Sequence, residues 1–262
     1  MDIEDRKLLT AHDDLLVRAV DFLRNPKLDP RSPGQFVILG LGARVLQLAH
    51  ALQALCEAGH AGEGAALARS ILSGTASLVA ICDDDREARA FAYVQGGRLT
   101  KSRIDGAARE LGLHHEELSE FVRKLADAST AGERQFVDAG VVAKRLGNDR
   151  SDTWHGWSDQ RLFEEMKMSS WYELSYRTFS DESHVSARAV TQEVREFTRR
   201  DVGFGSKFGP CWEVVLPSGR CVAKVLAQLN IVFEVDERDA VQGVSRPFED
   251  ALRAYKHYDH VT

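Results

Sequence analysis

Residues 36–60 have the sequence FVILGLGARVLQLAHALQALCEAGH, in which leucine and valine recur at three- to four-residue intervals. The recurring positions are Leu41, Val45, Leu48, Leu52 and Leu55. This is the period of a helical face, and the largely apolar residues between them predict a central helix buried on several sides. Gly59 and Gly62 mark its end.

The same spacing predicts further helices on both sides of this stretch. We expect them at residues 5–24, 63–82, 87–103 and 158–180, with a further helix to about residue 200 and a closing one at 248–260. Residues 115–146 alternate charge with apolar side chains and predict one or two solvent-facing helices. No useful strand alternation appears before residue 200, so the predicted fold class is all-α, a helical bundle.

Glycine and proline crowd residues 201–219, which predicts a loop insertion in the bundle, with residues 211–216 as a candidate short strand inside it. A chain of 262 residues can form one domain around one core. We therefore expect a single helical domain over residues 1–262. Its predicted parts are an N-terminal helix and Pro-rich connector (1–35), a core bundle (36–200), the loop insertion (201–219) and C-terminal helices (220–262).

The composition is that of a folded, soluble protein, with 44% hydrophobic and 28% charged residues. A formal net charge of −6 excludes a uniformly basic surface but allows a local basic stripe. Residues 1–5 have neither the basic start nor the apolar run of a signal peptide, and we expect no membrane-spanning segment of about 20 apolar residues. The expected location is the cytoplasm, without a membrane partner.

Neither a metal nor a cofactor is predicted. The four cysteines form no Cys-x-x-Cys pair and are expected to be reduced, half-buried small hydrophobes. The glycine-rich stretch at residues 203–209 lacks the glycine and strand positions of a phosphate loop. Only Asp181 and His184 come near the Glu-x-x-His spacing of a bundle metal site.

Residues 171–184, WYELSYRTFSDESH, concentrate polar groups of distinct chemistry in a stretch expected to be partly buried. Arg177 and His184 are seven residues apart, so a continuous helix would place them on one face, roughly 10 Å apart along its axis. Ser180 and Asp181 could instead end this helix and cap the next, which would let the two side chains converge.

The predicted face continues with Arg188, Arg195 and Arg199, and a row of guanidinium groups favours phosphate binding. An arginine can stabilise the charge of a phosphorane, while a histidine can take the proton from a ribose 2′-OH. Arg177 and His184 are therefore the candidate catalytic residues for metal-free RNA cleavage.

A purely structural interpretation of the same segment stays open. Arg177 and Asp181 have opposite charge at i, i+4 spacing and could pair with each other. His184 could cap or pack against a neighbouring helix, and Glu193 and Glu196 dilute the basic stripe.

Two short motifs resemble those of a family of uncharacterised bacterial helical proteins over roughly residues 38–190. The first is Arg69-Ser-Ile-Leu72, and the second comprises Tyr172, Tyr176, Ser180 and His184. Ser73 stands where such families usually carry a glutamate. The resemblance implies a buried polar cluster of Arg69, Tyr172, Tyr176 and His184, without implying a reaction.

The spacing of Arg177 and His184 is also similar to the signature of the HEPN superfamily. That resemblance implies a metal-independent endoribonuclease of toxin–antitoxin or phage-defence systems, with RNA as substrate, an antitoxin as candidate partner and a homodimer that builds the site. His184 would be the general base and Arg177 the phosphorane stabiliser. The candidate substrate-binding residues are Arg69, Tyr172, Tyr176, Ser180, Asp181 and Arg188.

The alternative hypothesis is a non-enzymatic helical module that binds a partner protein or ligand. In it, Arg69, Tyr176 and His184 form an internal hydrogen-bond network rather than a catalytic site.

Overall fold

Four long helices form the body of the described part of the computed structural model. They are α1 (Ile3–Leu23), α2 (Pro33–Glu57), α3 (Gly64–Asp83) and α11 (Trp212–Val232). The structure describes residues 3–83, 85–90, 92–94, 154–155, 157–176, 179, 211–235, 245–251 and 253. This described part contains helices and no strand, which confirms the predicted all-α class.

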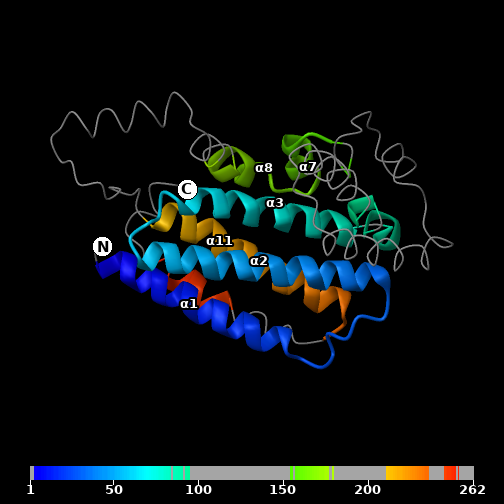
Figure 1. Cartoon of the computed structure of the whole chain (residues 1–262), viewed down its shortest axis with the longest axis horizontal. Helices are drawn as coiled ribbons and strands as arrows, with labels where there is room; N and C mark the ends of the chain where they lie inside the picture. Colours follow the sequence, from blue (N-terminus) through cyan, green and yellow to red (C-terminus); the bar gives the residue numbers. More distant parts are fainter. Residues whose placement is uncertain are drawn as a thin grey trace, which may run out of the picture.

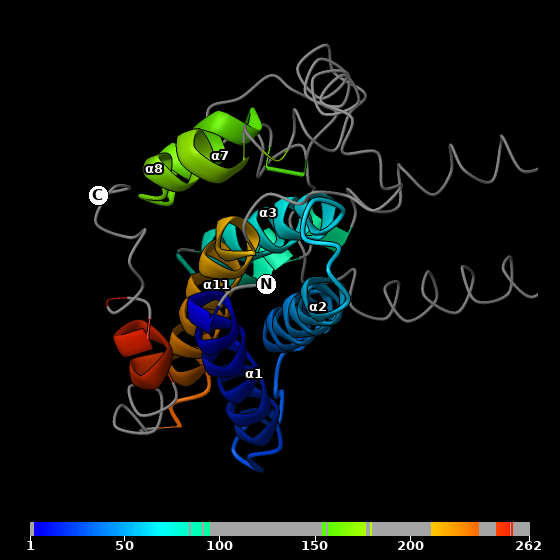
Figure 2. The same cartoon turned by 90° about the vertical axis from the view of Figure 1, so that its left-hand side faces the viewer.

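Helix α2 packs against α3 and α11, and α1 lies along α2 and α11 (Figures 1 and 2). The predicted core positions Leu41, Val45 and Leu52 are buried, whereas Leu48 and Leu55 are half-buried. The outer face of α2 remains exposed, with Phe36 70% exposed at its start. The prediction of a central helix at residues 36–60 is therefore confirmed, with one face toward the outside.

The beginning of α2 is held by side chains from two parts of the chain. Ser32 is the N-cap residue and accepts a hydrogen bond from the Gln35 amide, and Pro33 occupies the first turn. The Glu87 carboxylate accepts hydrogen bonds from the Ser32 hydroxyl (2.6 Å) and the Gly34 amide (2.8 Å). A carboxylate at a helix N-terminus also compensates the positive end of the helix dipole.

The prediction of a loop over residues 201–219 is wrong in its second half. Residues 212–219 are the first turns of α11, so the candidate strand at 211–216 is wrong as well. Pro217 inside this helix removes one backbone hydrogen bond, at a cost of about 3 kcal/mol. Burial outweighs this cost, because α11 carries a long series of buried residues at helical spacing: Val214, Val215, Ser218, Cys221, Val222, Val225, Leu226 and Leu229.

The prediction of a single helix over residues 158–180 is also wrong. The chain forms α7 (Asp159–Glu165), then α8 (Ser169–Trp171) and a π-helical turn, Tyr172–Tyr176. The break lies at Lys167, whose φ of 55° is left-handed and ends α7. Both α7 and the π-helical turn contact α3, on which they form a small second layer (Figure 2).

The remaining predicted elements are described only in part. Residues 86–90 and 92–94 are helical within the helix expected at 87–103, and residues 245–251 are helical near the expected closing helix. The solvent-facing helices expected at 115–146, the helix expected up to residue 200 and the loop residues 201–210 lie outside the described residues.

Two helices of the bundle also have the length and composition of membrane spans. In α2 and α3 the most apolar 18-residue windows have mean hydropathies of 1.4 and 1.6. The expectation that no segment approaches a membrane span is therefore wrong on length and composition. The windows are 39% and 56% buried within the bundle, and core helices of globular proteins share this composition.

The short helix at residues 245–251 is attached to the bundle through Phe248, which is 1% exposed. Its ring lies against Gly219 of α11, and a Cβ atom built at that glycine would collide with the ring. The absence of a side chain at position 219 therefore makes room for this aromatic contact.

We expect Gly219→Ala to destabilise the protein by about 1–3 kcal/mol, because the added methyl group overpacks the Phe248 site. Gly40→Ala is the matched control, since a Cβ at this exposed position of α2 meets nothing within 4 Å. Gly40→Ala should stabilise the protein by about 0.5–1 kcal/mol, because alanine has a higher helix propensity than glycine. Urea unfolding of both variants checks this pair, and equal stabilisation by both would contradict the Phe248 contact.

Candidate functional site

Three polar side chains from separate elements meet on the outer side of α3. Arg69 comes from α3, Asp159 from the first residue of α7 and Tyr176 from the end of the π-helical turn. Arg69 Nη2 donates to the Tyr176 hydroxyl at 3.4 Å, and that hydroxyl donates to Asp159 Oδ2 at 2.6 Å. We call these three residues the Tyr176 cluster.

Aromatic rings surround the Tyr176 cluster. Tyr172 stacks on Tyr176 with ring centroids 5.4 Å apart and planes inclined by 21°. Phe163 of α7 lies 5.2 Å from the Tyr176 ring and 5.7 Å from the Tyr172 ring. The Arg69 guanidinium carbon lies 5.2 Å from the centroid of the Tyr176 ring, within the range of a cation–π contact. The Tyr176 side chain is therefore held through both its ring and its hydroxyl.

The electrostatics make Tyr176 a neutral hydrogen-bond donor. Burial and the hydrogen bond to Asp159 raise the pKa of Tyr176 to about 12, against the opposing effect of Arg69. The phenol therefore keeps its proton at physiological pH and donates its hydrogen bond to Asp159. Its contacts instead link α3, α7 and the π-helical turn at one point.

The structure brings together three of the four residues that the family resemblance placed in one cluster. Arg69 contacts the Tyr176 hydroxyl, and Tyr172 stacks on Tyr176. The fourth residue, His184, lies outside the described residues. So do the other predicted site residues, Arg177, Ser180, Asp181 and Arg188.

The sequence does not predict Asp159 as a site residue. Its only local signal is its place after Ser158, which caps α7 by accepting a hydrogen bond from the Arg161 amide. That signal indicates a helix start and does not identify Tyr176, seventeen positions later, as a partner. The contact depends on the break at Lys167 that turns the chain back.

A second polar cluster lies inside the bundle and is structural. His12 is completely buried, with Nδ1 2.8 Å from Gln53 Oε1 and Nε2 3.1 Å from the Ser218 hydroxyl. Gln53 donates in turn to the Leu9 carbonyl and the Glu57 carboxylate. A neutral imidazole that donates to Gln53 and accepts from Ser218 satisfies both ring nitrogens. Burial lowers the pKa of His12 to about 4, so the ring is neutral at physiological pH.

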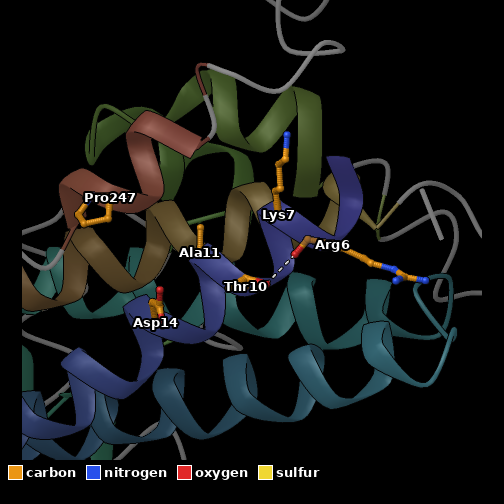
Figure 3. A pocket seen from close by; sticks show the side chains of 6 residues that line it. All are labelled: Arg6, Lys7, Thr10, Ala11, Asp14 and Pro247. Atoms are coloured by element: carbon orange, nitrogen blue, oxygen red, sulfur yellow. Dashed lines mark hydrogen bonds between the residues drawn. The ribbon is translucent and has the colours of Figure 1, made fainter. Parts of the chain in front are cut away.

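The surface depression beside α1 does not form a binding site for an anion. It is lined by Arg6, Lys7, Thr10, Ala11, Asp14 and Pro247. Figure 3 shows the two cationic side chains pointing in different directions, and the Thr10 hydroxyl donates to the Arg6 carbonyl one turn earlier. Convergent polar groups, which a specific site requires, are missing from this depression.

The thiols and carboxylates of the described residues offer no metal centre. No group of three His, Cys, Asp or Glu side chains suited to a metal occurs there. Burial raises the pKa of the Cys56, Cys82 and Cys221 thiols to about 12. All four cysteines are free, and these three remain protonated small hydrophobes at physiological pH.

Comparison with known protein families gives a match over much of the chain. Residues 35–201 match the model of a family of unknown function, DUF5677, which covers more than half of the 262-residue chain. The match includes α2 from Gln35 onward, α3 and the Tyr176 cluster, and leaves α1 and α11 outside. No curated protein and no solved structure matches the chain. The expected membership of an uncharacterised family is confirmed, whereas the similarity to HEPN proteins stays a prediction.

The lowered pKa of His12 predicts a stability that depends on pH. The unfolded chain binds a proton at this residue below about pH 6.5, whereas the folded protein binds it only near pH 4. The free energy of unfolding therefore has its full value above about pH 6.5 and decreases by about 3 kcal/mol as the pH falls to 4. Urea unfolding between pH 4 and 7.5 measures the loss. His12→Gln should flatten this part of the profile, and an unchanged slope would contradict the assignment.

Proposed function

This chain belongs to DUF5677, a family of unknown function, and we propose that it is a metal-independent endoribonuclease similar to those of the HEPN superfamily. In this mechanism His184 takes the proton from a ribose 2′-OH, whose oxygen attacks the adjacent phosphorus. Arg177 stabilises the negative charge of the phosphorane. The bond between phosphorus and the 5′ oxygen then breaks, this oxygen takes a proton from water, and the other product ends in a 2′,3′-cyclic phosphate.

The observation that carries this proposal is the π-helical turn Tyr172–Tyr176, which ends one residue before Arg177 in the chain. Short π-helical turns are rare and occur frequently at functional sites. Tyr176 is 5% exposed and its hydroxyl contacts both Arg69 and Asp159. These contacts hold Tyr176, the residue before Arg177 in the chain. This supports the proposal, because an arginine that stabilises a transition state is most effective when it is held in place beforehand.

The other predicted residues have roles in RNA binding. Ser180 and Arg188 would donate hydrogen bonds to phosphate oxygens, and Asp181 would orient one of these donors. Arg69 and Tyr172 border the same region, because both contact Tyr176. The proposal includes a cytoplasmic homodimer that acts on RNA as a toxin or phage-defence effector, with an antitoxin as candidate partner.

The proposed reaction predicts RNA cleavage by the purified protein in the presence of EDTA. Gel analysis of total cellular RNA should show fragments that end in 2′,3′-cyclic phosphate. His184→Ala and Arg177→Ala should each lower the cleavage rate by about 100-fold or more. His60→Ala changes an exposed histidine in the turn after α2 and should leave the rate unchanged. No cleavage by the wild type, or full activity of His184→Ala, would refute the proposal.

A second candidate function is a non-enzymatic helical module that binds a protein or ligand. The hydrogen bond between Arg69 and the Tyr176 hydroxyl favours it, because this candidate requires an internal Arg/Tyr network. The short hydrogen bond from Tyr176 to Asp159 extends that network to α7.

The second candidate predicts that network variants lower stability without affecting RNA. His184→Ala, Arg69→Met and Tyr176→Phe should each cost about 1–3 kcal/mol, measured as a lower Tm. Tyr172→Phe keeps the stacked ring and serves as the control, with an unchanged Tm. Loss of RNA cleavage in His184→Ala at an unchanged Tm would favour the ribonuclease instead.

A further inference from the structure

Asp159 holds the strongest single hydrogen bond of the Tyr176 cluster. Its carboxylate accepts from the Tyr176 hydroxyl at 2.6 Å, a distance typical of charge-assisted O–H···O⁻ hydrogen bonds. The longer contact from Arg69, at 3.4 Å, reaches the same hydroxyl oxygen. The hydroxyl thus accepts from a cation and donates to an anion, and hydrogen bonds in such a chain strengthen one another.

Helix α7 keeps Asp159 in a fixed position relative to the tyrosine. Ser158 caps the helix, and its buried residues Leu162 and Phe163 pack into the core. The Phe163 ring packs at a tilt against the rings of both Tyr172 and Tyr176. The acceptor and the rings therefore rest on the same short helix, which makes the Asp159–Tyr176 contact a rigid connection between α7 and the end of the π-helical turn.

We propose that Asp159 is a positioning residue, which acts on the reaction at Arg177 through the Tyr176 hydroxyl. The inference rests on the proposed ribonuclease function and adds to it a residue outside the predicted catalytic pair. In this proposal Asp159 transfers no proton and binds no RNA. Its carboxylate holds the last residue of the π-helical turn, and the peptide bond that leaves this residue leads to Arg177.

A double-mutant cycle tests this connection in the full-length protein. Asp159→Ala removes the acceptor, Tyr176→Phe removes the hydroxyl but keeps the stacked ring, and the third variant carries both changes. We expect Asp159→Ala to lower kcat for RNA cleavage by about 10–100-fold with KM within about twofold, as for a misplaced transition-state contact. The double variant should be no slower than Tyr176→Phe alone. Asp159→Asn keeps an oxygen acceptor and should recover part of the loss.

The matched control is Glu165→Gln, at the other end of α7. Its carboxylate is half-exposed and pairs only with Arg161 among the described residues, at 3.6 Å. This variant should cleave RNA at the wild-type rate. An unchanged kcat in Asp159→Ala would overturn the inference. So would additive losses in the double variant, because Asp159 would then act by a route other than the Tyr176 hydroxyl.

A readout that needs no activity separates this inference from the proposed function. Amide hydrogen exchange over residues 172–176 should be faster in Asp159→Ala and Tyr176→Phe than in the wild type or Glu165→Gln. If the wild type does not cleave RNA, the proposed function fails, and faster exchange would still support Asp159 as the anchor of the turn. Unchanged exchange in Asp159→Ala would show that Asp159 does not anchor the turn, whether or not the wild type cleaves RNA.

Discussion

The structure depends on the burial of α2 between α1, α3 and α11. An apolar helix of 25 residues gains its stability from packing on several sides, and the other three long helices are arranged to provide it. The outer side of α3 then remains available as a support for α7 and the π-helical turn. The Tyr176 cluster is therefore placed by the bundle, since Arg69 is fixed by the buried stripe of α3.

The apolar periodicity predicted those parts of the fold in which burial and local preference agree. Helices α1, α2 and α3 begin and end within a few residues of the predicted positions, because the spacing of their leucine and valine residues matches their buried faces. The sequence wrongly predicts a loop at the start of α11, because Pro217 and Gly219 favour a loop locally. Tertiary packing decides there, since Phe248 occupies the space that the glycine leaves.

For the candidate site, the sequence predicted the residues but not their connections. Arg69, Tyr172 and Tyr176 were grouped by resemblance, and the structure brings them together. Asp159 could not be predicted, because its contact arises only after Lys167 turns the chain between α7 and α8. A left-handed lysine leaves no clear pattern in a sequence, whereas a glycine at the same position would have indicated the break.

The place of α11 in the chain has a consequence for biosynthesis. Residues 84–211 separate α3 from α11 in sequence, although the two helices pack side by side. At about 5–20 residues per second, a ribosome needs on the order of ten seconds to synthesise this interval. During that time α1, α2 and α3 have emerged without the helix that covers their shared apolar surface. The nascent chain therefore exposes this apolar surface to solvent until α11 has been synthesised.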